Sequence, residues 1–415
     1  MRCLSTAALV TSLGLALTGC VDHRAGITGT QSIGVELVSP ADPGDIDHRL
    51  PDIAPTATVT VTVNLTAYDA AYAVDTTFDR DVEVYAQFLG TVTPTPTVDT
   101  YTGLVATPLA TFHLTAGRAM NQSVTLPRVL GPTTLWIEDG PKAGAGRKID
   151  PSYVPTYATG TSPVLWFRDP FIFDLQTPVD ETRIDALQVS PLQNKQVTVS
   201  ASRYGSVGRL VVTSVFAQGY TVSDVKCMDA AGTPPCTTEA YNHIEVFSSS
   251  APRDQMGRLL EQGQVIDEFS GGISEFNGLT EVGFPVTLAT SDAVTPDRQA
   301  PPVKLDPNTW FNGLNDSKGI INFERNEAAP IEIDNAVVCP LDSAYDRFKE
   351  WKIAPSGVCG GNVIDVVTAG VIADLDPATL VGKTLPRMVG VLRPIETSGN
   401  IWIIYPRSSA DLTLP

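Results

Sequence analysis

Apolar and polar residues alternate along several short segments of the chain, most regularly at residues 58–65. This segment reads TVTVTVNL, so that valine or leucine occupies every second position. Period-two alternation of β-branched residues predicts a strand with one buried face. Further strands are predicted at 82–89, 109–114, 122–126, 133–137 and 164–167. Because turn residues separate these strands and no helical segment intervenes, residues 55–182 are predicted to form an immunoglobulin-like β-sandwich.

Two more groups of strands follow, each with the spacing of a small barrel. The first is predicted at 209–216, 220–227, 243–248, 263–269 and 279–286, with a helix at 253–261. Five strands with a helix after the third follow the plan of an OB-fold barrel, which we place at 207–288. The second is predicted at 331–339, 347–353, 362–368, 388–392 and 400–405, and indicates another OB-like barrel at 328–415. A single barrel with a long insertion fits the same strands less economically, so the prediction is an all-β chain with a sandwich and two barrels.

The segments between these units are predicted to be connectors because they lack apolar periodicity. Residues 20–54 are interpreted as a flexible tether, 183–206 as a linker, and 289–327 as a linker or insertion. The 33 Gly and 32 Pro among 415 residues favour short strands joined by turns over a helical bundle. A hydrophobic content of 43% is sufficient for folded cores and argues against bulk disorder.

The first twenty residues differ from the rest of the chain. Arg2 precedes an apolar run at residues 7–17, which is too short to span a bilayer. The run ends in the sequence LTGC, which resembles the lipobox of bacterial lipoproteins. The resemblance implies that residues 1–19 are a signal peptide and that Cys20 carries lipid, which makes the membrane a partner of the protein. An ordinary secretory signal with an incidental cysteine is the alternative.

The residue after the lipobox cysteine bears on the location. Familiar Gram-negative lipoproteins that stay in the inner membrane carry Asp at this position, whereas this chain carries Val21. The resemblance therefore implies a cell-envelope protein, lipid-anchored at the outer membrane.

The remaining cysteines of the exported chain fall into two close pairs. Cys227 is near Cys236 in the sequence, and Cys339 is near Cys359. An oxidising compartment permits disulfides, and the short spacing favours these local pairings among the three that four cysteines allow. A zinc site is the rival interpretation, but the spacing is not C-x-x-C and the nearby histidine is His243.

The charge balance weighs against a primary role on nucleic acids. The formal net charge is −18, and residues 207–288 contain four basic and ten acidic residues. Proteins that bind nucleic acids usually present a basic face, because affinity comes mainly from counterion release at phosphates. We therefore expect binding no tighter than the non-specific range of about 10⁻⁴ to 10⁻⁶ M.

Three segments in the second half of the chain resemble the OB-like modules of secreted bacterial nucleases. They are 219–224, 274–281, and 387–392 followed by 405–412. In those nucleases the modules precede a catalytic domain of the endonuclease/exonuclease/phosphatase type. The resemblance covers residues 207–415 and implies barrel architecture. Because the sequence stops at Pro415, we expect the module without that catalytic domain.

The sequence contains no recognisable set of catalytic or metal-binding residues. The four histidines stand in isolated contexts, and no G-x-S-x-G motif is present. Asp267 and Glu268 are adjacent on a predicted strand, so their side chains point to opposite faces. We therefore predict a protein without enzymatic activity, metal or cofactor.

Aromatic and basic residues of the first predicted barrel are the candidates for ligand binding. Tyr220, Phe247 and Phe276 are candidate stacking platforms, near Arg203 and Arg209. The alternative assigns the same aromatic residues to the barrel core. The expected function is a non-catalytic binding or scaffolding module for an unidentified protein, glycan or nucleic acid. The alternative function is an accessory nucleic-acid-binding subunit of an extracellular nuclease system.

Lipidation of Cys20 is open to a direct test. We expect the Cys20→Ala variant to leave the membrane fraction, because several acyl chains at about 0.8 kcal/mol per buried CH₂ are what hold the parent there. Cell fractionation followed by immunoblotting measures the distribution. A variant that stays in the membrane fraction like the parent places the anchor elsewhere.

Overall fold

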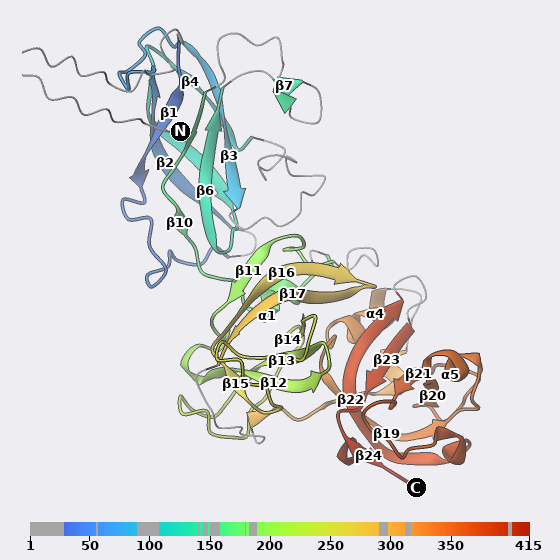
Figure 1. The fold of residues 1–415 in the computed structure, drawn as a ribbon. Helices are drawn as coiled ribbons and strands as arrows, with labels where there is room; N and C mark the ends of the chain where they lie inside the picture. Colours follow the sequence, from blue (N-terminus) through green and yellow to red (C-terminus); the bar gives the residue numbers. More distant parts are fainter. Residues whose placement is uncertain are drawn as a thin grey trace, which may run out of the picture.

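Three β units follow one another along the chain in the computed structural model of this protein (Figure 1). The structure describes residues 29–54, 57–88, 108–139, 142–143, 148–149, 158–178, 180–181, 189–289, 298–311, 317–396 and 401–415. Each unit has its own hydrophobic core. The predicted all-β fold class is confirmed, and no helix of the described ranges exceeds eight residues.

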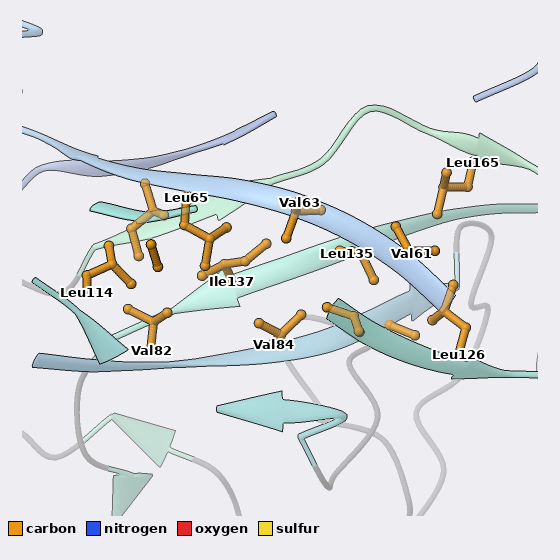
Figure 2. Close-up of a cluster of buried hydrophobic side chains, with 14 of the residues drawn as sticks. Val61, Val63, Leu65, Val82, Val84, Leu114, Leu126, Leu135, Ile137 and Leu165 are labelled. Carbon is orange, nitrogen blue, oxygen red and sulfur yellow. The ribbon is translucent and has the colours of Figure 1, made fainter. Parts of the chain in front are cut away.

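The first unit is an eight-stranded sheet that folds over its own core. In spatial order its strands are β4 (Ala110–Leu114), β3 (Arg80–Phe88), β6 (Pro132–Glu138), β9 (Thr159–Thr161), β1 (Ser32–Ser39), β2 (Thr58–Tyr68) and β5 (Arg118–Pro127), with β10 (Leu165–Trp166) beside β6. Figure 2 shows Val61, Val63 and Leu65 of β2 facing Val84 and Ile137 across the core. The alternation of 58–65 therefore buries one face, as predicted, whereas the immunoglobulin-like plan stays a prediction. The short strands β7 (Lys142–Ala143) and β8 (Lys148–Ile149) form a separate pair.

Strand β1 lies within the segment predicted to be a tether. It pairs with β2, and Ile33 is buried in the core with Val35 and Leu37 packed against it. The prediction of a flexible stretch through residue 54 is therefore wrong at β1, because these three residues alternate like those of any half-buried strand. The signal peptide and Cys20 lie outside the described residues, so their assignment stays a prediction.

The second unit is a barrel with the strand order of an OB fold. Its strands are β12 (Gly208–Phe216), β13 (Gly219–Lys226), β14 (His243–Phe247), β15 (Val265–Ile266), β16 (Glu268–Phe276) and β17 (Leu279–Leu288). The pairs run β12–β13–β14–β17–β16, and β14 and β17 are parallel. Strand β15, which β16 follows after one residue, pairs back with β12 and closes the ring. The order is thus first, second, third, fifth and fourth strand, as in an OB barrel.

The third unit repeats this ring with a different sequence. Its strands are β19 (Pro330–Val338), β20 (Glu350–Ala354), β21 (Ile364–Val367), β22 (Thr384–Glu396) and β23 (Ile401–Tyr405), with β18 (Val303–Lys304) and β24 (Leu412–Thr413) added at its margins. The pairs run β19–β20–β21–β23–β22, with β21 parallel to β23, and β22 pairs with β19 to close the ring. The prediction of two barrels rather than one is confirmed by these two separate rings.

Elements from the predicted connectors complete both barrels. Strand β11 (Gln196–Val199) lies in the predicted linker 183–206 and pairs with β16. Helix α1 (Ile172–Gln176) lies in the segment assigned to the sandwich, yet it buries Ile172 and Leu175 in the first barrel core. Helices α3 (Pro307–Trp310) and α4 (Ser317–Glu324) lie in the predicted linker 289–327, and they place Trp310 and Phe323 in the second core. Helix α5 (Ser343–Phe348) precedes β20.

The helix predicted at 253–261 is wrong, because this segment forms turns. The Asp254 carboxylate accepts hydrogen bonds from the backbone N–H groups of Met256 and Arg258. Gly257 adopts a φ of 76°, which glycine accepts and which interrupts a helix. A short-range Asp–Gly turn therefore overrides the helical pattern at this position.

Both predicted disulfides are present, and the zinc interpretation is wrong. Cys227 is bonded to Cys236 and Cys339 to Cys359, with sequence separations of 9 and 20 residues. The first bond packs against Val211 and Val225 in a small buried cluster. The second closes a loop that contains α5 and β20.

The longer disulfide loop yields a stability prediction. Replacing Cys339 and Cys359 together by Ala is expected to lower the free energy of unfolding by about 3 kcal/mol, because the unfolded chain regains the entropy that closing the loop removes. Urea unfolding followed by circular dichroism measures the change. An unchanged midpoint at an unchanged slope contradicts the prediction.

Candidate functional site

A groove of about 620 Å³ lies between the two barrels, and we call it the inter-barrel groove. The first barrel contributes the β12–β13 turn and β14, and the second contributes β22, β23 and the loop after β21. The lining residues are Ser214, Val215, Phe216, Ala217, Gln218, Glu245, Phe247, Val367, Ala369, Gly370, Val371, Val391, Arg393, Tyr405, Pro406 and Arg407. The turn between the first two strands and the face of strands two and three are where OB barrels bind ligands.

Strand β14 presents polar side chains to the neighbouring barrel. Ile244 and Val246 point into the core of the first barrel, so His243, Glu245 and Phe247 occupy the opposite face of the strand. His243 is buried and hydrogen-bonds Ser223 at 2.6 Å through Nδ1, and burial lowers its pKa to about 3. His243 is therefore neutral at physiological pH.

An ion pair joins the two barrels in the wall of the groove. The Arg393 guanidinium of β22 donates to Glu245 at 2.7 Å, and the Glu245 side chain has no exposed surface. Burial raises the pKa of Glu245 to about 7, although Arg393 opposes the shift. The Arg393 guanidinium also lies over the rings of Phe216 and Tyr405, with its central carbon 5.5 and 5.3 Å from their centroids. One arginine thus connects the carboxylate and two aromatic walls.

Arg407 joins the barrels at the other end of the groove. It pairs with Asp411 through two hydrogen bonds of 2.8 and 2.9 Å. It also donates to the Thr213 carbonyl at 3.3 Å and to Gln299 at 3.2 Å. Both arginines of the groove therefore already have acidic partners, which keeps the groove close to neutral.

A cluster of buried glutamates lies elsewhere on the interface between the barrels. Glu327, in the turn after α4, accepts hydrogen bonds from the Thr280 backbone N–H at 3.0 Å and from Gln176 at 3.3 Å. Glu275 accepts from the backbone N–H of Ser190 at 2.7 Å. Burial raises the pKa of Glu275 to about 7 and that of Glu327 well above its usual range.

Glu324 belongs to the same cluster and behaves similarly. Burial, with Glu327 and Glu275 nearby, raises the pKa of Glu324 well above its usual range. Like charges so close together in a dry interface favour neutral carboxyls, so these glutamates join the barrels as protonated acids. Among the described residues, no group of three or more His, Cys, Asp or Glu side chains is placed to hold a metal ion. Helices long and apolar enough to cross a bilayer are likewise absent from the described ranges.

The structure does not gather the five ligand-binding candidates at one site. Phe247 is half-buried and lines the groove. Tyr220 is buried in the first barrel core, where its hydroxyl hydrogen-bonds Thr287 at 2.6 Å. Phe276 is 60% exposed at the end of β16, outside the groove.

The two arginine candidates have structural contacts. Arg203 lies over the ring of Phe173 at 4.2 Å and pairs with Glu239 at 3.0 Å. Arg209 donates to the backbone carbonyls of Ser206 and Ala230, next to the Cys227–Cys236 loop. Neither lines the inter-barrel groove.

The groove residues that sequence reasoning missed share one signal. Glu245 and Arg393 are single charged residues within otherwise apolar strands, which read HIEVF and MVGVLRPI. A charge at such a position is buried only with a partner. The partner could not be identified from the sequence, because 148 residues separate the two.

Comparison with known protein families and with curated proteins finds no match for this chain.

The buried glutamates predict that the folded chain is more stable at mildly acidic pH. The folded state keeps protons on Glu245 and Glu275 up to about pH 7, whereas the unfolded chain releases them near 4.5. The free energy of unfolding is therefore expected to fall between pH 5 and 8, on the order of 2 kcal/mol for each such carboxyl. His243 opposes this trend with one proton below about pH 6.5.

Thermal unfolding of the full chain between pH 5 and 8 measures this dependence. Glu275→Gln, which imitates the protonated acid, is expected to raise the melting temperature at pH 8 and to flatten the profile. Glu261→Gln, at an exposed position, is the matched control and should change neither. A melting temperature that rises from pH 5 to pH 8 contradicts the prediction.

Proposed function

We propose that this chain is an exported, lipid-anchored envelope protein whose two barrels form a non-catalytic binding module, with the inter-barrel groove as the ligand site. The observation that carries the proposal is the contact of Arg393 with Glu245, Phe216 and Tyr405 inside an open groove. It combines aromatic faces with fixed hydrogen-bonding groups, the usual composition of a binding site. The lipobox resemblance at residues 17–20 supports the anchor and the envelope location.

The groove chemistry favours an uncharged glycan as the ligand. Both arginines are paired with carboxylates, so the groove offers little net positive charge to a polyanion. The rings of Phe247 and Tyr405 can pack against the apolar faces of sugar rings, while Arg393 and Gln218 supply hydrogen bonds to hydroxyls. Binding of oligosaccharides is common among OB barrels.

The absence of a nucleophile–base pair in the groove supports the non-catalytic part of the proposal. The lining residues include no histidine or cysteine, and the one serine, Ser214, is buried. The glutamate of the groove, Glu245, is engaged by Arg393. These groups suit recognition better than acid–base or nucleophilic chemistry.

An accessory nucleic-acid-binding subunit is the alternative. Aromatic rings beside arginines are also the means by which proteins bind single strands. The resemblance of residues 207–415 to nuclease-associated modules favours this alternative, and the acidic composition of the first barrel opposes it.

The test is a glycan array of envelope oligosaccharides, probed with the mature chain. Phe247→Ala is expected to weaken the strongest signal about three- to tenfold, the cost of losing one aromatic stacking contact. Phe276→Ala is the matched control, because this exposed aromatic residue lies outside the groove, and it should leave binding unchanged. Equal losses in the two variants, or no bound glycan, contradict the proposal.

A labelled single-stranded oligonucleotide distinguishes the alternative. Fluorescence anisotropy at two salt concentrations should show weak binding, no tighter than about 10⁻⁴ to 10⁻⁶ M, with a shallow salt dependence. Nanomolar binding with a log–log slope of several times about −0.7, lost in Arg393→Gln, establishes the nucleic-acid alternative instead.

A further inference from the structure

A second pocket lies where the sandwich meets the first barrel, and we call it the junction pocket. Its volume is about 460 Å³, within the range of ordinary small-molecule sites, and such sites prefer domain junctions. Three segments form its wall: the β5–β6 turn at 128–132, the approach to α1, and residues 191–198 with β11. Figure 1 shows β11 on the side of the first barrel that faces the sandwich.

Most of the wall of the junction pocket is aliphatic. The apolar lining residues are Val129, Leu130, Pro132, Pro170, Pro191, Leu192 and Val197. The prolines and the short turns limit how far the wall can collapse on an empty pocket. A ligand with an aliphatic body gains free energy by removing this surface from water.

The acidic groups of the junction pocket are already neutralised by arginines. Asp174 accepts from Arg128 at 2.9 Å and from Arg168 at 2.7 Å. Asp169 accepts from Arg49 at 2.8 Å. A cationic ligand would therefore have to displace an arginine from its carboxylate.

Lys195 is the remaining charged residue of the lining. It is half-buried, and burial lowers its pKa below the ordinary value. An anion placed beside a desolvated ammonium group is held more strongly than in water, because the local dielectric is low. The charged groups that line the pocket together with Lys195 are Arg128, Asp169 and Asp174, and the two acids are the ones engaged by arginines.

We propose that the junction pocket binds an aliphatic monocarboxylate, with its chain against the leucine, valine and proline wall and its carboxylate at Lys195. The ligand contacts the sandwich through the β5–β6 turn and the first barrel through β11. Binding therefore fixes the relative position of these two units. This site is independent of the inter-barrel groove and of the function proposed for it.

The experiment is calorimetric titration of the mature chain carrying Cys20→Ser, which needs no detergent, with octanoate and with 1-octanol. Octanoate is expected to bind more tightly than octanol. Lys195→Met should weaken octanoate at least about tenfold, the value of one charged hydrogen bond, and should leave octanol unchanged. Lys226→Met, at an exposed position on β13, is the matched control and should affect neither probe.

Two further measurements locate the ligand. Octanoate affinity should fall as the pH rises through the pKa of Lys195, and this dependence should disappear in Lys195→Met. Thr198→Trp fills the pocket from the face of β11 opposite the core residues Val197 and Val199, and it should abolish binding of both probes with an unchanged near-UV spectrum. Equal affinities for octanoate and octanol, or full octanoate binding by Lys195→Met, overturn the proposal. Absence of octanoate binding by the parent chain overturns it as well.

Discussion

Glu245 and Arg393 belong to different barrels, and the way the barrels meet depends on their pairing. The carboxylate of Glu245 has no exposed surface and lies on the face of β14 that its own barrel core does not use. Breaking a buried ion pair by removing one partner costs about 3–5 kcal/mol, because the other charge stays buried. Arg393 reaches Glu245 only when β22 packs across β14. The same packing opposes Phe216 to Tyr405 and thereby forms the inter-barrel groove.

The rest of the interface is built from acids for which no comparable cation is present. Glu275, Glu324 and Glu327 each have a carboxylate oxygen with no hydrogen-bond partner among the described residues. Ionising all three in a dry interface would place like charges side by side, so burial raises the pKa of each of them. The association of the two barrels is thereby coupled to proton binding. An envelope protein exposed to external pH would experience this coupling directly.

Local sequence rules succeeded where short-range interactions decide the structure. The TVTVTVNL alternation produced β2, and the strand spacing produced two rings of the same order. The disulfide pairings followed from spacings of 9 and 20 residues. The same rules failed at 253–261, because the Asp254 side chain and Gly257 stabilise turns more strongly than the apolar pattern favours a helix. They also missed β1, whose alternation was hidden in a polar stretch.

The sequence by itself determined the all-β class, the number of barrels and the cysteine pairs, because each depends on residues close together in the chain. Only the tertiary structure decided which aromatic residue serves which purpose. Tyr220 and Phe247 look alike as strand aromatics, yet the pleat of β13 turns Tyr220 into the core, and that of β14 turns Phe247 towards the second barrel. The partner of Glu245 lies 148 residues away, and no local pattern can specify a contact that exists only after two barrels have closed and packed together.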